Sequence, residues 1–280
     1  MVSELPASIS PPDLSIPPRP QAMLVLMEEM ARDEPDLGRV TKAIQADPGL
    51  AGGMLKVVNS PAFGLAKKAT TISQAVSFLG LRNIASISSG LALRHAAADP
   101  SNRAMERFWD TAENVALICA ELARRLRGIS PDEAYTFGLF HDCGIPLIMR
   151  RFPKYHETLA RANLGQGNSF DKVEVAEVGT HHGAVGYFVA RSWHLTDHLS
   201  KAILWHHDLE VFDDESSASD TVRNYVGIIH LAEHIHHLRM RSVDDAEWER
   251  FGERVLAHFA LSNEDYLNLV DGMQDLLSEA

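Results

Sequence analysis

Cysteine is scarce in this chain, and long apolar runs are missing. The 280 residues include two cysteines, Cys119 and Cys143, too few for a disulfide framework or a zinc site made of thiolates. We therefore expect a reducing, cytoplasmic setting. No run of 18 apolar residues occurs, and the first twenty residues lack the basic segment and apolar core of a secretory signal. The sequence thus predicts neither a membrane span nor export.

Basic residues are outnumbered by acidic ones. Lys and Arg number 26 against 38 Asp and Glu, which gives a net charge of −12. Binding to a phosphate backbone depends on a surplus of presented cations, so the charge balance argues against nucleic acid as a partner. With 45% hydrophobic and 23% charged residues, the composition is that of an ordinary globular protein with one large domain or two modest ones.

The spacing of apolar residues is helical throughout, and strict alternation typical of strands is missing. Val115, Ile118 and Leu122 recur at helical intervals, and Ser130 followed by Pro131 is a typical helix start. The sequence predicts an all-α protein with two lobes. Six of the 13 prolines fall within the first twenty residues, which indicates an extended leader. The expected parts are a Pro-rich leader over 1–15, an N-terminal helical lobe over 17–97, a second helical lobe over 103–212, and C-terminal helices over 220–280 that pack on the second lobe.

Histidine is concentrated in one stretch, where ten of the 14 histidines fall between His181 and His237. Imidazole is costly to bury unpaired and is the commonest metal ligand, so this density indicates either a buried polar network or a metal site. The adjacent His141 and Asp142 can offer one nitrogen and one carboxylate oxygen to a single divalent ion. Such a mixed donor set suits Mn²⁺, Fe²⁺ or Mg²⁺ better than a structural zinc.

Each candidate histidine also has a structural explanation. His182 lies among glycines at 179, 183 and 186, which let another helix approach closely, so it is equally well explained as a packing residue. His206 shares a helical face with Leu199 and Ile203 and should point into the core, where a hydrogen-bonded structural role is the ordinary one. No single segment decides between the two roles.

A metalloprotease pattern also occurs, because His230, Glu233 and His234 match the spacing H-x-x-E-H. At about 100° per residue, His230, His234 and His237 share a helical face with Arg223, which predicts a polar and exposed side, whereas Glu233 turns toward the interior. Only 43 residues follow His237, which leaves little room for a further ligand and a substrate cleft. We interpret the match as coincidence.

Taken in order along the chain, the segments resemble the HDOD family, regulatory relatives of the HD-domain metal-dependent phosphohydrolases. The likeness covers residues 16–212, and in the N-terminal lobe it rests on the segments DPGL, LKVVNSPAF and ISQAVSFLGL. Asp47 can cap a helix that starts at Pro48, Pro61 ends that helix, and Gly80 forms a tight corner between helices. The residues of this family signature for which we predict structural roles are Asp47, Pro48, Asn59, Ser60, Leu79 and Gly80.

The second lobe carries the rest of the resemblance, in the segments FGLFHDCG and AILWHH and in Glu174, Gly179, Gly186 and Trp193. Catalytically competent relatives bind one or two metals with an earlier histidine, the His-Asp pair, later histidines and a final acid. The metal-ligand candidates that the resemblance implies here are His141, Asp142, His182, His206, His207 and Glu233.

Several positions depart from the pattern of those relatives. The earlier histidine is replaced by Thr111, which shares a helical face with Val115 and Ile118 and is therefore expected in the core, without a useful lone pair for a metal. The lysine often found shortly after the His-Asp pair is Ile145 here. Pro146 should kink the backbone beside the pair, because it lacks a helix donor and clashes with the carbonyl four residues back.

The incomplete ligand set favours a non-catalytic signal-transduction module that acts on signalling proteins through protein–protein interaction, with no cofactor expected. The alternative is a metal-dependent phosphohydrolase of nucleotides or cyclic-dinucleotide phosphodiesters. Its rearranged site would bind a single divalent metal, which could be Mn, Fe, Mg, Ni or Zn. The sequence favours no particular oligomeric state.

Overall fold

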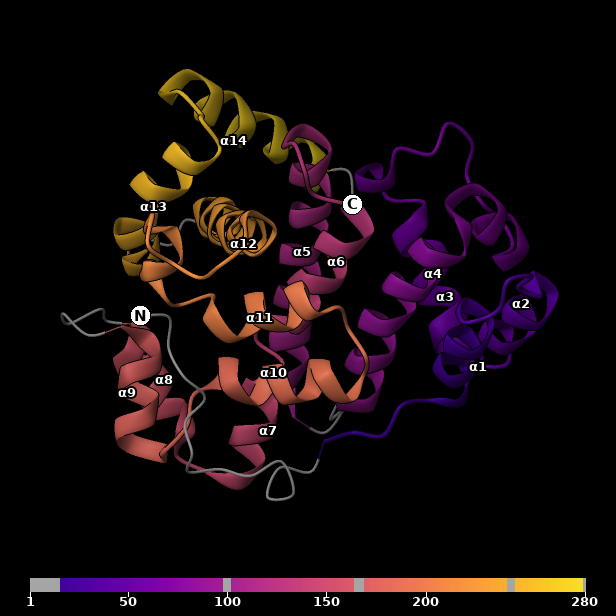
Figure 1. Cartoon of the computed structure of the whole chain (residues 1–280), viewed down its shortest axis with the longest axis horizontal. Coiled ribbons are helices and arrows are strands. Elements are labelled where there is room, and N and C mark those ends of the chain that lie inside the picture. Colours follow the sequence, from indigo (N-terminus) through magenta and orange to yellow (C-terminus); the bar gives the residue numbers. More distant parts are fainter. Residues whose placement is uncertain (1–15, 98–101, 164–168, 241–244, 279–280) are drawn as a thin grey trace. The chain divides into compact units, whose positions relative to one another are not determined.

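The computed structural model describes residues 16–97, 102–163, 169–240 and 245–278, and within these ranges it contains helices and no strand, as predicted (Figure 1). The expected leader over 1–15 lies outside them. The α-helices are α1 (Gln21–Met30), α2 (Leu37–Gln45), α3 (Pro48–Val58), α4 (Ile72–Ala97), α5 (Arg103–Arg125), α6 (Pro131–Phe140), α7 (Gly144–Arg151), α8 (Tyr155–Asn163), α9 (Phe170–Val178), α10 (His182–Ser192), α11 (Asp197–Trp205), α12 (Asp220–Arg239), α13 (Ala246–His258) and α14 (Asn263–Ser278). Two 3₁₀ helices, η2 (Pro61–Phe63) and η3 (Leu209–Phe212), complete the set.

The helices form two compact units, Pro17–Leu139 and Phe140–Glu279. The sequence placed the boundary between the two lobes between residues 97 and 103. Residues 98–101 fall outside the described residues. The division falls instead at the end of α6, because α6 packs within the first unit. Tyr135 makes an edge-to-face contact with Phe63 of η2, with ring centroids 6.1 Å apart, and the Thr136 Oγ1 donates to Ser86 Oγ of α4 at 3.2 Å.

In the first unit, residues of the family signature cap the start of a helix, fix the chain after its end, or form a corner between helices. Asp47 Oδ1 accepts the Leu50 N–H at 3.0 Å and so caps α3. After α3 ends at Val58, the Asn59 side chain binds the main chain of Ala69 through its Nδ2 at 2.8 Å and its Oδ1 at 2.7 Å. Gly80 interrupts α4 with a φ of 80°, a value that favours glycine, and so makes the corner that the sequence indicates.

One helix in the described part of the chain, α4, is long and apolar enough to cross a membrane by length and composition alone. Of its most apolar 18-residue window, 56% is buried inside the protein. The buried core helix of a soluble protein meets the same criterion, so this finding does not identify α4 as a membrane-spanning helix.

In the second unit, most helices pack on their neighbours in sequence: α8 pairs with α9, α10 with α11, and α12 with α11 and α13, while α10 also contacts α7 (Figure 1). Close main-chain approach fixes the centre of this arrangement. A Cβ added at Gly144 would lie 2.1 Å from the His182 carbonyl oxygen, so the start of α7 touches the start of α10. Pro146 is the third residue of α7, where its missing N–H costs no helical hydrogen bond. Where the sequence predicted a kinked helix, the helix is interrupted completely by a turn over residues 141–143.

Candidate metal centre

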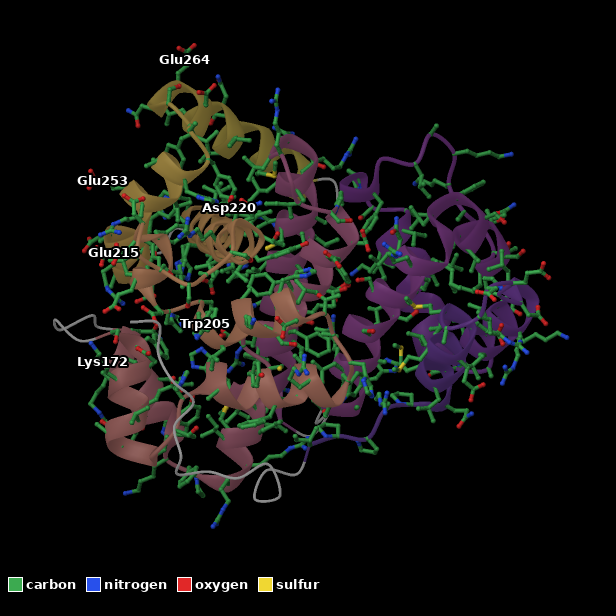
Figure 2. All side chains as sticks on the ribbon, in the orientation of Figure 1. Lys172, Trp205, Glu215, Asp220, Glu253 and Glu264 are labelled. Atoms are coloured by element: carbon green, nitrogen blue, oxygen red, sulfur yellow. The ribbon has the colours of Figure 1, made fainter. Side chains whose placement is uncertain are left out.

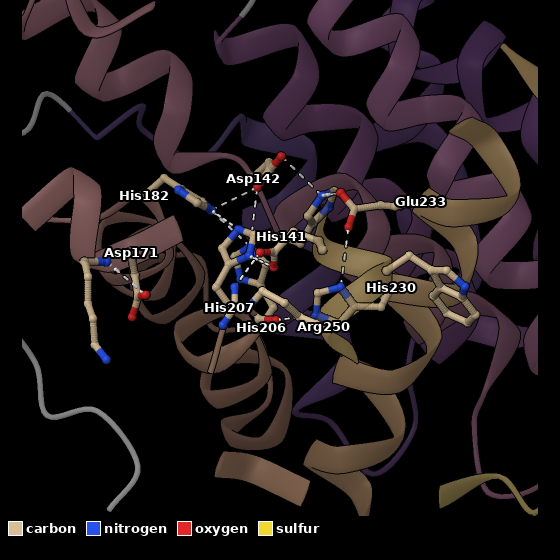
Figure 3. A network of polar contacts seen from close by, with 12 residues as sticks. His141, Asp142, Asp171, His182, His206, His207, His230, Glu233 and Arg250 are labelled. Atoms are coloured by element: carbon tan, nitrogen blue, oxygen red, sulfur yellow. Dashed lines mark hydrogen bonds and ion pairs between the residues drawn. The ribbon is translucent and has the colours of Figure 1, made fainter. Parts of the chain in front are cut away.

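Six polar residues from four separate segments of the chain meet inside the second unit (Figure 3). They reach the same place because each lies at a helix end or on a buried helix face. His141 and Asp142 occupy the turn between α6 and α7, His182 is the first residue of α10, and the pair 206–207 directly follows α11. Glu233 comes from the middle of α12. The six ligand candidates of the sequence are therefore neighbours in space.

Four of them form the first donor group, which we call group A: Asp142, His182, His206 and His207. The His182 Nε2 lies 3.0 Å from His206 Nε2 and 3.1 Å from His207 Nε2. Asp142 Oδ1 lies 3.2 Å from His182 Nε2 and 3.5 Å from His206 Nε2. Donor atoms around a tetrahedral or octahedral cation are about 3.0–3.6 Å apart, given bonds of about 2.0–2.2 Å. The spacing of group A matches such a shell.

The protonation pattern of the three imidazoles is fixed by their other nitrogens. His206 Nδ1 donates to the Ile203 carbonyl oxygen at 2.7 Å. His182 Nδ1 lies 2.7 Å from a Glu174 carboxylate oxygen, and His207 Nδ1 lies 2.7 Å from a Glu247 carboxylate oxygen. Because each Nδ1 carries its proton toward an acceptor, the Nε2 of each neutral ring presents a lone pair.

In the neutral state of the rings, three lone pairs and a carboxylate oxygen therefore face one another, all within 4.8 Å. Such a cluster is repulsive unless a positive charge lies in its midst, and that charge is either a proton or a metal ion. Burial disfavours the charged form of His182, but Glu174 and Asp142 outweigh it and hold the His182 pKa well above its usual range. Burial and the neighbouring His207 lower the pKa of His206 to about 3, so that ring stays neutral and available to a metal. The residues of group A thus fit a divalent cation.

A second donor group, group B, comprises His141, Asp142 and Glu233. The His141 Nε2 lies 3.4 Å from Asp142 Oδ2 and 3.3 Å from Glu233 Oε1. Burial opposes protonation of His141, but the two carboxylates prevail and raise its pKa to about 10. Asp142 belongs to both groups, with one carboxylate oxygen directed at each. This arrangement offers places for two cations side by side, whereas the sequence favoured no cofactor and gave a single divalent metal as the alternative.

The structure adds residues that sequence reasoning gave no role. Glu174 of α9 is fully buried beside His182, and the Tyr155 hydroxyl of α8 donates to its other carboxylate oxygen. Phe170, four residues before Glu174 and so on the same helical face, stacks on the His207 ring with centroids 4.6 Å apart. The resemblance had already singled out Glu174 without a role, and the four-residue spacing from Glu174 is the one local signal that could have found Phe170.

Two expectations about helix faces are wrong. His230 and His234 are 2% and 8% exposed, not solvent-facing, because Phe251 and Trp248 of α13 stack on their rings. Thr111 is exposed on α5, although its spacing from Val115 predicted a core position. The buried stripe at this end of α5 passes instead through Met105, Trp109 and Ala112.

Comparison with known proteins agrees with this architecture and with the resemblance. The family described as "HDOD domain" matches residues 16–209, which is most of the chain. The chain belongs to the HDOD family. An uncharacterized protein of Treponema pallidum (strain Nichols) is 27% identical over 217 residues, which cover 74% of this chain, and the match spans 40% of that protein's length.

Solved structures of HDOD and phosphohydrolase-named proteins share the fold. A crystal structure from Shewanella amazonensis SB2B, named "Putative phosphohydrolase", has a TM-score of 0.67 and 23% identity, covering 93% of this chain and 90% of that one. An HDOD domain protein with unknown function from Geobacter sulfurreducens has a TM-score of 0.65 and 22% identity, covering 99% of this chain and 91% of that one. At these identities the likeness shows the fold alone.

Proposed function

We propose that this HDOD protein is a regulatory signal-transduction module whose buried histidine–carboxylate cluster binds divalent metal and whose output is contact with partner signalling proteins. The observation that carries the proposal is the convergence of the three imidazole Nε2 atoms and an Asp142 carboxylate oxygen in group A. Because the Nδ1 protons are directed at other acceptors, these four atoms face a place where a proton on His182 and a divalent cation are alternatives.

The donors indicate which metals suit each group. Group A offers three imidazole nitrogens and one carboxylate oxygen, a set that suits Zn²⁺, Fe²⁺ or Ni²⁺. Group B offers one nitrogen and two carboxylate oxygens, which suits Mn²⁺ or Mg²⁺ better. A cation in either group would tie the turn at residues 141–143 to α10, α11 or α12, and so would stabilise the packing of the second unit.

The chemistry of the remaining chain supports a role among cytoplasmic proteins. The chain has two cysteines, both buried, which are too few for a disulfide framework and suit a reducing compartment. The net charge of −12 favours protein partners over nucleic acid.

Thermal unfolding with and without metal tests the proposal. A ligand that binds only the folded state raises the melting temperature, so Mn²⁺ or Zn²⁺ added to metal-stripped, untagged protein should raise it with a saturable concentration dependence. The variant Asp142→Asn should lose most of this shift, because both groups use that side chain. The control variant Asp197→Asn, an exposed acid on α11, should keep it. Equal shifts in Asp142→Asn and Asp197→Asn would contradict the proposal.

A metal-dependent phosphohydrolase is the second candidate, and one observation favours it. Asp142 directs one oxygen at each of two donor groups, an arrangement that can hold paired cations of the kind that act as Lewis acids on phosphoryl oxygens. Against it, the position of the lysine beside the pair holds Ile145, which is 8% exposed and carries no charge. Metal-loaded protein that hydrolyses a nucleotide or cyclic dinucleotide, with activity abolished in Asp142→Ala, would establish this candidate. Metal-loaded protein without hydrolysis would favour the regulatory module.

A further inference from the structure

We propose that Glu247 of the C-terminal helix α13 is a positioning residue for group A, and that metal occupancy is thereby coupled to the docking of α13. The inference rests on the proposed function, since it concerns how this same cluster binds metal. It gives the C-terminal helices a specific role, which is to report whether the centre is filled.

The contact that carries the inference joins residues 40 positions apart. Glu247 is the second residue of α13, and its Oε2 lies 2.7 Å from His207 Nδ1. Its Oε1 accepts from Arg250 Nη1 at 2.6 Å, which holds the carboxylate in place. The exposed fractions of the two partner side chains are 11% for His207 and 22% for Glu247. By contrast, Glu253 of α13 and Glu264 of α14 are exposed and point outward (Figure 2).

Glu247 differs from the other groups that orient the ligand histidines. The partner of His206 is the carbonyl of Ile203, three residues before it on α11, and the partner of His182 is Glu174 on α9. Only His207 of these three depends on a helix from the C-terminal part of the chain. The hydrogen bond from His207 Nδ1–H to Glu247 favours the tautomer and ring orientation in which the Nε2 lone pair faces group A.

Further contacts of α13 lead back to the same centre. Phe251 stacks on the His230 ring with centroids 3.7 Å apart, and His230 Nε2 donates to the His206 carbonyl oxygen at 2.6 Å. Asp245 caps α13 by accepting the Trp248 N–H at 3.0 Å. The other oxygen of Asp245 lies 2.7 Å from His234 Nδ1 on α12. Helix α13 therefore contacts three histidines of the second unit. His207 belongs to group A, His230 contacts the main chain of His206, and His234 lies on α12.

Linkage follows from this connectivity. If His207 Nε2 held a cation, its ring would lose electron density and its Nδ1–H would become a stronger donor to Glu247. Metal binding should therefore strengthen the docking of α13. Because coupling between two binding events is reciprocal, the docked α13 must strengthen metal binding to the same extent.

Hydrogen–deuterium exchange of the full-length chain, with and without saturating Mn²⁺ or Zn²⁺, tests the coupling. Metal should slow amide exchange over residues 246–258 by several-fold in the wild-type chain. The variant Glu247→Gln should bind metal about 10–100-fold more weakly, as measured by competition with a chelator. At saturating metal it should show little of the slowing. Glu249→Gln, an exposed acid in the same first turns of α13, is the matched control and should behave as wild type.

The outcomes separate this inference from the function on which it rests. If wild-type protein binds no metal, the proposed function fails and the coupling fails with it. If wild-type protein binds metal but exchange over 246–258 is unchanged, the coupling alone is overturned, and this comparison needs no variant. Equal metal affinity of Glu247→Gln and Glu249→Gln would likewise overturn the positioning role.

Discussion

Glu174 and His182 form a contact that is closed to solvent on both sides: Oε2 and Nδ1 lie 2.7 Å apart, and each side chain is 0% exposed. The same carboxylate accepts the His182 main-chain N–H at 3.3 Å, so it holds both the backbone and the ring at the start of α10. Glu174 thereby connects the α8–α9 hairpin to group A.

Replacement of Glu174 should therefore be costly in stability and in metal binding. Removal of one member of a buried pair leaves the other charge without compensation, so Glu174→Ala should lower the free energy of unfolding by about 3–5 kcal/mol, measured in urea. Tyr155→Phe removes only the hydroxyl that donates to Glu174, and should cost about 1–3 kcal/mol. Two variants of near wild-type stability would show that the pair does not hold α10.

Glycine substitutions test how tightly α7 meets α10. A Cβ at Gly144 would lie 2.1 Å from a main-chain oxygen, which cannot move without shifting α10, so Gly144→Ala should destabilise by about 1–3 kcal/mol. Gly52 in α3 has no atom within 4 Å of an added Cβ, so Gly52→Ala should gain about 0.5–1 kcal/mol from helix propensity. Urea midpoints measure both, and a change of equal sign in the two variants would refute the packing argument.

Acid sensitivity of the first unit should depend on Glu29. The Asp36 N–H donates to its buried carboxylate at 2.8 Å, and Arg39 Nη1 binds the other oxygen at 2.6 Å. These contacts lower the Glu29 pKa from 4.5 to about 2, although burial opposes the shift. A carboxyl with a lowered folded-state pKa stabilises the fold above its unfolded pKa, and this contribution is lost as pH falls from 4.5 toward 2.

The comparison of Glu29→Gln with wild type across pH measures that contribution. The difference in melting temperature should be constant above about pH 5 and should shrink below it. Glu28→Gln is the matched control, because Glu28 also binds Arg39 at 2.6 Å but its side chain is 58% exposed. That control should change the melting temperature little at any pH. A Glu29→Gln difference that stays constant down to pH 3 would contradict the assignment.

Local chemistry made much of the fold predictable. The cap at Asp47, the corner at Gly80 and the helix start at Pro131 depend on neighbouring residues only, so the sequence alone reveals them. The division into units was not predictable in this way, because it depends on which helices, distant in the sequence, α5 and α6 pack against.

The site shows the same limit. The six candidate ligands could be named from the sequence because the order of motifs resembles a known family. The residues that fix the tautomers of these histidines could not be named in this way. Glu247 looks like an ordinary acid in the first turn of a helix, and its role depends on a contact with His207 that spans 40 residues. His230 and His234 appeared exposed because nothing in α12 itself shows that α13 covers that face.

Metal quantification tests the central claim most directly. Untagged protein, supplied with Mn²⁺, Fe²⁺, Zn²⁺ or Ni²⁺ and then freed of excess by gel filtration, should retain about one to two equivalents of metal per chain by elemental analysis. Asp142→Asn should retain distinctly less, because the amide is uncharged and offers one oxygen where the carboxylate offers one to each donor group. Wild-type protein that retains less than about a tenth of an equivalent of every metal would contradict the account.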